Sequence, residues 1–144
     1  MKFNDAILRG DFVKAKELAS QMNMDTLRDT LFLLAYEGGS IAPYGFVNYL
    51  LLEEETSEIH YITSYLLSMA LNHLEGAYQI AFHHAKKAAE LLPNDMSYKE
   101  YLLFFHTIPE RLLRKDEAVK IANIILENEP NNKAALLVIK EIKK

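Results

Sequence analysis

Apolar residues recur along this chain at spacings of three and four positions, which is the pattern of amphipathic helices. Glycine or proline interrupts the pattern at intervals, as expected where one helix ends and the next begins. No segment alternates apolar and polar residues over the length of a typical strand. The expected helices cover 11–22, 24–37, a segment with Pro43 in its first turn that ends near 54, a longer one through 59–70, 78–92, 97–107, 116–128 and 133–142. The pattern predicts an all-α protein of about eight or nine short helices.

Polar residues and glycines at the ends of these segments support the same boundaries. Asp11 is placed to cap the helix over 11–22, and Thr56 or Ser57 is placed to cap the helix that follows. The pair Gly38-Gly39 is expected to end the helix over 24–37. The segment 97–107 is apolar on nearly every side, which predicts a central, buried helix.

One stretch of the chain carries small residues, a glycine and a proline at a regular spacing. Its positions are Gly76, Tyr78, Ala81, Ala85, Ala88 and Pro93. This spacing resembles the turn and second helix of a tetratricopeptide repeat (TPR), and Tyr65 falls where that family has an aromatic residue in its first helix. Weaker copies surround Ala15, Gly45 and Ala118, so that with Ala81 the small residues stand 30, 36 and 37 positions apart.

The resemblance implies a right-handed superhelix of antiparallel helix pairs, a TPR-like α-solenoid, in a single domain over 1–144. The clearest repeat is 62–95, the weaker units are 1–23, 24–56 and 96–130, and a terminal capping helix covers 131–144. By resemblance, the first helix of each pair lines a concave surface that binds peptides or protein segments. An unrelated helical bundle is the alternative fold.

Charge is distributed unevenly along the chain. Residues 29–85 contain seven Asp or Glu and no Lys or Arg, whereas the whole chain has 16 Lys or Arg, 20 Asp or Glu and a net charge of −4. The same window holds six of the eight tyrosines. One interpretation is a run of buried helices whose few exposed positions are acidic. The other is an acidic, tyrosine-rich face that binds a basic protein or peptide.

The acidic window supplies most of the candidate partner-binding residues, because tyrosines and carboxylates suit an interface with a basic partner. These residues are Glu37, Glu53, Glu54, Glu55, Glu58, Tyr61 and Tyr65. Packing of the two tyrosines into the core is the alternative for that pair. If the site lies elsewhere, the groove around Asn72, Lys99 and His106 is the next candidate.

Few residues in the sequence suggest catalysis or a cofactor. The chain has no cysteine, and its five histidines form no metal-binding motif, since the adjacent His83 and His84 would point about 100° apart on a helix. No phosphate loop or nucleophile motif is present. We therefore expect no enzyme activity, no cofactor and no metal site.

The remaining expectations concern partners and location. Nucleic acid is disfavoured because no basic face is evident, and no apolar run approaches the roughly 18 residues that a bilayer span needs. The first residues turn polar at once, so we expect a cytoplasmic protein, and we expect it to be monomeric. The predicted function is a protein- or peptide-binding module. The alternative is a bacterial immunity or inhibitor protein that neutralises a basic toxin domain.

Overall fold

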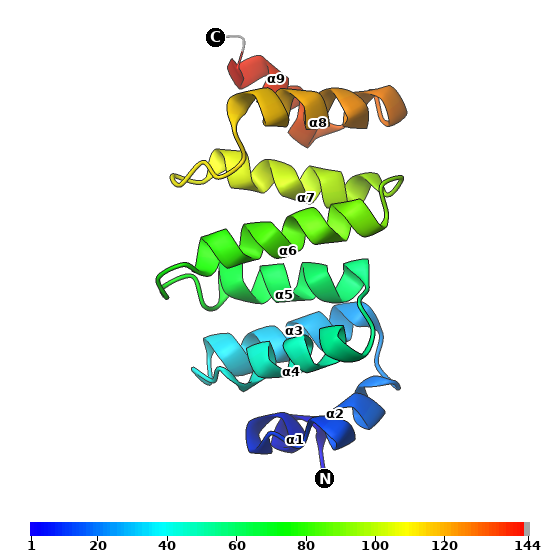
Figure 1. Ribbon diagram of the computed structural model, residues 1–144, viewed down its shortest axis with the longest axis vertical. Helices are drawn as coiled ribbons and strands as arrows, with labels where there is room; N and C mark the ends of the chain where they lie inside the picture. The colour runs from blue at the N-terminus through cyan, green and yellow to red at the C-terminus, as the bar shows by residue number, and fades with distance from the viewer. Residues whose placement is uncertain (143–144) are drawn as a thin grey trace. The chain divides into compact units, whose positions relative to one another are not determined.

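The computed structural model describes residues 1–142, and within them the chain forms helices and no β-strand (Figure 1). The nine helices of this part are α1 (Phe3–Arg9), α2 (Phe12–Ala19), α3 (Met24–Tyr36), α4 (Ala42–Glu53), α5 (Ser57–Met69), α6 (Ala77–Leu91), α7 (Met96–Thr107), α8 (Lys115–Asn128) and α9 (Lys133–Ile142). The all-α prediction is confirmed for these residues. The last two positions of the expected terminal helix, 143 and 144, lie outside the described residues.

Side-chain caps explain why several helices begin where the sequence predicts. Asp11 accepts a hydrogen bond from the backbone N–H of Lys14 at 3.1 Å, and Thr56 accepts one from the backbone N–H of Ile59 at 3.2 Å. Asn23 caps α3 in the same way, and its own backbone is extended. Helix α2 ends at Ala19, three residues earlier than expected, and hydrogen bonds from Gln21 and Met22 to the Leu18 and Ala19 carbonyls form a turn after it.

Helix α1 is absent from the predicted helices because it has only seven residues and little periodicity. Its buried side chains, Ala6 and Ile7, are adjacent in the sequence. Gly10 ends it with a left-handed φ of 74°, a conformation that glycine adopts without steric cost.

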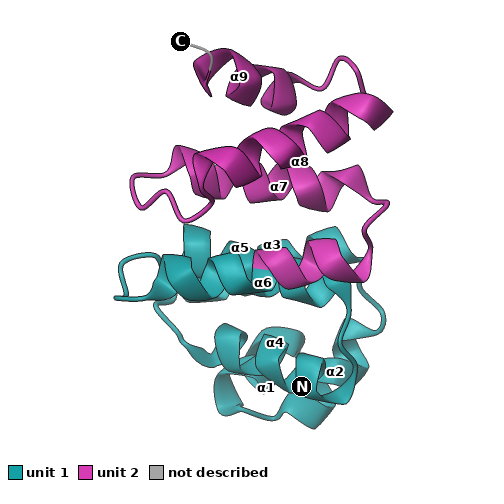
Figure 2. Ribbon diagram, turned by 45° about the horizontal axis from the view of Figure 1, so that its top comes forward, with its two compact units in different colours: residues 1–84 teal, residues 85–144 magenta. Residues whose placement is uncertain are grey.

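The chain divides into two compact units, Met1–His84 and Ala85–Lys144, with the boundary inside α6 (Figure 2). Each unit is described here by itself. The expected division into repeat units stays a prediction, as does a superhelical arrangement. None of the helices in residues 1–142 combines the length and the hydropathy that crossing a membrane requires.

In unit 1, α4 packs against α1, α2, α3 and α5, and α3 also packs against α5. Phe46 is fully buried and meets the rings of Phe3 and Phe12 at centroid distances of 5.8 and 5.6 Å. A Cβ atom on Gly45 would lie 3.3 Å from the Phe12 ring, so the small residue expected at this position allows a close approach.

In unit 2, α8 packs against both α7 and α9, and α7 packs against α9. Ala118, Ala122 and Ile125 form the buried side of α8. Helix α7 departs from the expected all-round burial. Its buried residues lie in its second half, from Leu102 to His106, whereas Glu100 in its first half is exposed.

Candidate functional site

The acidic residues of the predicted face lie where α4 ends and α5 begins, but they differ in what they contact. Glu53 forms an ion pair with Lys16, and hydrogen bonds from Lys16 and Tyr49 lower the pKa of the Glu53 carboxyl. The same contact raises the pKa of the Lys16 ammonium. The charge of Glu53 is therefore balanced within unit 1.

Glu54 and Glu58 line a pocket of about 270 Å³, which we call the acidic pocket. Neither carboxylate forms an ion pair within residues 1–142, and both side chains are exposed. The apolar part of the lining includes Ala19, Met24, Leu27, Leu50 and Ile59. Lys16, which is paired with Glu53, also lines the pocket, and Glu54 attracts its ammonium. The pocket thus combines an apolar floor with two carboxylates and one lysine, and it keeps an excess of negative charge.

Tyr61 and Tyr65 belong to a row of aromatic rings along α3 and α5, which we call the aromatic strip. The ring of Tyr65 lies 6.1 Å from Tyr61 and 5.7 Å from Phe32, and Phe32 stacks on Tyr36 at 5.3 Å. Tyr61 and Tyr65 are half-buried, and Tyr36 is 63% exposed. Neither alternative for the tyrosine pair, core packing or exposure at an interface, describes it alone, because each ring packs on a neighbour and keeps an exposed part.

Arg28 is the residue of this surface that the sequence analysis missed. Its guanidinium carbon lies 5.4 Å from the centre of the Tyr65 ring, which is a cation–π geometry. Ion pairs with Asp25 and Asp29 flank it, and the hydrogen bond to Asp29 raises the pKa of the guanidinium. Arg28 lies one residue before the base-free window. Its partner Tyr65 lies on another helix, so no local spacing in the sequence signals the contact.

Glu55 contacts a buried pair of histidines instead of the acidic pocket. The Nε2–H group of His60 donates to Glu55 Oε1 at 2.8 Å, and Nδ1 of His60 lies 2.8 Å from Nδ1 of His84. His60 is 6% exposed and His84 is 8% exposed. Burial, followed by the neighbouring His60 and His83 rings, lowers the pKa of His84 to about 4.

Two nitrogens that face each other at hydrogen-bond distance need one proton between them, because one must donate and the other must accept. The contact between His60 and His84 therefore excludes a state in which both facing nitrogens are protonated. The sequence analysis considered the neighbours His83 and His84 and missed His60. The available signal was that His60 and His84 lie equally far along the chain from residue 72, which is in the turn between α5 and α6. Equal distances from the turn place two residues side by side in an antiparallel helix pair.

The other predicted residues are spread over both units. Glu37 is exposed at the end of α3, and Asn72 in unit 1 donates to the Tyr78 hydroxyl at 3.1 Å. In unit 2, Lys99 donates to the backbone carbonyl of Pro93. His106 is buried, with Nδ1 3.1 Å from the Leu113 carbonyl oxygen. Lys99 and His106 are two helical turns apart on α7, and a groove shared with Asn72 stays a prediction.

The structure thus brings Glu54 together with Glu58 and Tyr61 together with Tyr65, and it gives Glu53 and Glu55 partners of their own. Residues 1–142 contain no group of three His, Cys, Asp or Glu side chains that converge as a metal site requires. No protein-family model matches the chain, and no curated protein or solved structure shows significant similarity to it.

Proposed function

We propose that this protein is a non-catalytic binding module that holds a basic segment of a partner protein against unit 1. The observation that carries the proposal is the acidic pocket, where Glu54 and Glu58 form no ion pair with any residue of 1–142 and an apolar floor lies between α2, α3, α4 and α5. A Lys or Arg side chain fits this combination, because its methylene groups pack on apolar surface while its charge meets a carboxylate.

The aromatic strip extends the proposed binding surface along α3 and α5. Glu58, Tyr61 and Tyr65 are three and four positions apart, so they share one face of α5. Half-exposed tyrosines offer a large contact area with little loss of side-chain entropy and are frequent in interfaces. Arg28 covers part of the Tyr65 ring and is itself paired with Asp25 and Asp29, so the acidic residues of this surface without an ion pair in residues 1–142 lie at its Glu54 end.

The proposal includes a TPR-like superhelical order of the helix pairs. It is supported by the complete burial of Ala15, Ala81 and Ala118, three of the four small residues on which the resemblance rests; the fourth, Gly45, is half-buried. Small-angle X-ray scattering of the full chain tests this part, because an elongated superhelix and a closed bundle of equal mass differ in maximum dimension. A profile that fits a closed bundle would refute the superhelix and leave the acidic pocket untouched.

The alternative partner is a folded basic toxin domain rather than a flexible segment. It is favoured by Leu52, which is 89% exposed at the end of α4, beside the acidic residues. A folded domain would cover Leu52 as well as the pocket, whereas a single basic side chain would not. Leu52→Asp is therefore expected to weaken binding of a folded domain and to leave binding of a short peptide unchanged.

The direct test is capture of partners from the host, followed by affinity measurement with purified partner. Reversal of both pocket charges, Glu54→Lys with Glu58→Lys, is expected to weaken binding by about tenfold or more and to reduce its dependence on salt. The matched control is Glu110→Lys with Glu127→Lys, which changes two exposed acids of unit 2 and gives the same net charge. Equal losses in the two double variants would refute a specific role for the acidic pocket.

A further inference from the structure

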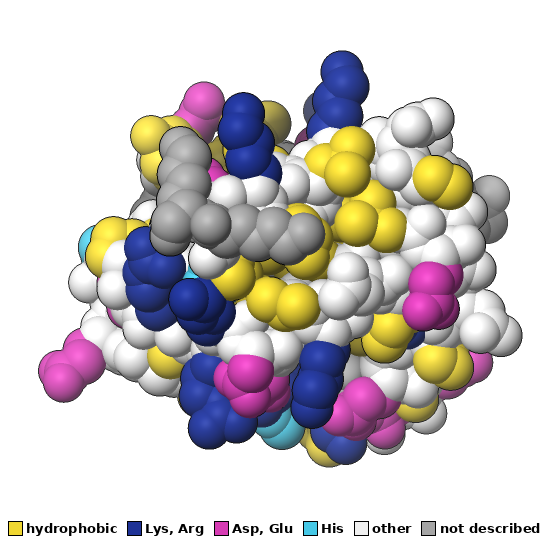
Figure 3. All heavy atoms as spheres, turned by 90° about the horizontal axis from the view of Figure 1, so that it is seen from above, with side chains coloured by type: hydrophobic (Ala, Val, Ile, Leu, Met, Phe, Trp, Pro, Cys, Tyr) yellow, Lys and Arg dark blue, Asp and Glu magenta, His cyan; other side chains and the backbone are white. Residues whose placement is uncertain are grey.

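Unit 2 contains a second pocket with the opposite charge, and it is separate from the surface described above. Its volume is about 770 Å³, and its lining comes from the end of α7, the α7–α8 loop, the first residue of α8 and the end of α9. The side of unit 2 that carries α9 displays Lys and Arg side chains beside apolar ones (Figure 3). We call this site the basic pocket.

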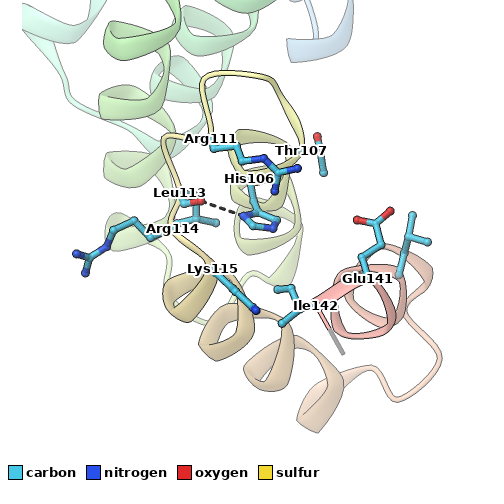
Figure 4. A pocket seen from close by; sticks show the side chains of 9 residues that line it. His106, Thr107, Arg111, Leu113, Arg114, Lys115, Glu141 and Ile142 are labelled. Atoms are coloured by element: carbon cyan, nitrogen blue, oxygen red, sulfur yellow. Dashed lines mark hydrogen bonds between the residues drawn. The ribbon is translucent and has the colours of Figure 1, made fainter. Parts of the chain in front are cut away.

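Two cations of the basic pocket form no ion pair with any residue of 1–142. Arg111 and Lys115 line it, and neither forms an ion pair within the described part of the chain. Arg114 differs, because ion pairs with Asp116 and Glu117 occupy its guanidinium, which points away from the pocket (Figure 4). Glu141 is the acidic residue of the lining, so the pocket retains an excess of positive charge.

The backbone at Arg111 is strained in a way that supports a functional role. Its φ is 44°, and among residues 1–142 it is the only residue other than glycine with a positive φ. This conformation is uncommon for residues other than Gly, Asn and Asp, and it persists only where the surroundings impose it. Here it places a guanidinium at the pocket, beside His106 and Thr107 (Figure 4).

His106 supplies the buried polar group of the pocket. It is 6% exposed, and because a carbonyl oxygen only accepts, its Nδ1 must carry the proton donated to Leu113. The other ring nitrogen, Nε2, has no hydrogen-bond partner in the described residues and is available to a ligand. When the ring is protonated, Nε2 becomes a third donor beside Arg111 and Lys115.

The start of α8 is the next feature at the basic pocket. Lys115 is the first residue of α8, and Arg114 before it provides no side-chain cap. The first N–H groups of a helix have no intrahelical partner and its dipole favours an anion at this end, a preference that Asp116 and Glu117 in the first turn of α8 already meet in part. The direction agrees with the charges of Arg111 and Lys115.

We propose that the basic pocket binds the phosphoryl group of a small phosphate monoester, whose apolar part packs against Leu137 and Ile142. Arg111 in the α7–α8 loop and Lys115 at the start of α8 approach a central anion from separate directions, and His106 on α7 adds a third donor when its ring is protonated. A tetrahedral phosphate dianion accepts from all of them, whereas a planar carboxylate is already satisfied by one guanidinium. Leu137 and Ile142 offer the apolar surface that an inorganic ion does not use.

The test is a calorimetric titration of the full chain at low salt with three probes, phenyl phosphate, inorganic phosphate and benzoate. Phenyl phosphate is expected to bind in a one-to-one complex and more tightly than the other two. Arg111→Gln and Lys115→Gln are each expected to weaken it about fivefold or more, and Arg114→Gln about twofold or less. Glu141→Gln is expected to tighten it, because it removes the negative charge at the edge.

Several outcomes would overturn the proposal. These are the absence of saturable binding of phenyl phosphate, tighter binding of benzoate, and equal losses in the Arg111→Gln and Arg114→Gln variants. Arg111→Gly guards against a misfolded variant, because glycine relieves the positive φ. It is expected to raise the melting temperature while phenyl phosphate binding weakens at least as much as in Arg111→Gln. None of these results depends on the acidic pocket of unit 1, so the two proposals fail or stand separately.

Discussion

Helix α5 is buried on every side except the one that carries Glu58, Tyr61, Tyr65 and Met69, whereas α8 buries one face. The chemistry of the two buried surfaces also differs. The buried residues of α5 include five polar side chains, Ser57, His60, Thr63, Ser64 and Ser68. The buried residues of α8 are Ala118, Ala122 and Ile125, all apolar. The interior of α5 therefore depends on hydrogen bonds and on protonation, whereas the interior of α8 depends on volume alone.

The polar groups on α5 are satisfied to different degrees. Thr63 donates to the Ile59 carbonyl oxygen at 2.8 Å, and Ser64 donates to the Ala81 carbonyl oxygen at 2.7 Å. The Ser68 hydroxyl is buried without a hydrogen-bond partner in the described residues. This difference makes α5 the place where small chemical changes should have opposite effects.

The largest expected effect comes from adding volume where α5 meets α6. Ala81 is fully buried, and its carbonyl accepts the Ser64 hydrogen bond, so Ala81→Leu both overpacks the contact and stretches that bond. We expect Ala81→Leu to lower the free energy of unfolding by about 3 kcal/mol. Ala118→Leu adds volume without disturbing a side-chain hydrogen bond, and we expect it to lower the free energy of unfolding by about 1–3 kcal/mol.

Urea denaturation measures both changes. The control is Gln79→Leu, which adds a leucine to an exposed position of the same helix as Ala81. If Ala81→Leu were no more destabilising than Gln79→Leu, the prediction that α5 and α6 approach each other closely at Ala81 would be wrong.

The next largest effect is a loss of stability at low pH, which the histidine pair of unit 1 causes. Because the pKa of His84 is about 4 in the folded protein and near 6.5 when unfolded, the unfolded chain takes up the proton first as pH falls. Stability is therefore expected to decrease between about pH 6.5 and pH 4, by at most about 3 kcal/mol.

Denaturation at pH 7.5, 6 and 4.5 checks this prediction. Three titratable groups adjoin His84 or its partner, namely His83, His60 and Glu55. His84→Gln keeps a donor and an acceptor but removes the titration, so its stability should vary less between pH 6.5 and pH 4. An unchanged slope in that variant would assign the acid sensitivity to other groups.

The smallest expected effect is a reversal of sign between two identical substitutions on α5. Ser64→Ala removes a hydrogen bond and should destabilise the protein by about 1 kcal/mol. Ser68→Ala removes a buried hydroxyl that has no partner and should stabilise it by about 0.5–1 kcal/mol. Thermal melts of the two variants measured side by side decide the point, and a loss of stability in both would mean that Ser68 has a partner.

Local signals in the sequence predict most of the helices, and long-range contacts explain what they miss. A cap such as Asp11 or Thr56 acts on a residue three positions away, so the sequence reveals it directly. Lys16 and Glu53 are 37 positions apart, and nothing near either residue shows that they pair. The acidic window therefore predicts the location of the negative charge but not which carboxylates stay unpaired.

The same limit applies to the two buried sites. The contact of His60 with His84 depends on how two helices align across a turn, and periodicity within each helix carries no information about it. The positive φ of Arg111 depends on the whole α7–α8 connection. Glycine would be the residue expected there, so an arginine gives no warning of that conformation.

The shared proton of His60 and His84 also has a consequence for how this protein can change over generations. Loss of either ring leaves the other with a buried nitrogen and no partner, which costs more than the loss of both together. Positions 60 and 84 are therefore expected to show epistasis. Descendants should reach an apolar pair at positions 60 and 84 through an intermediate such as glutamine, because its amide both donates and accepts. Single replacements of one of these histidines by leucine should be rare.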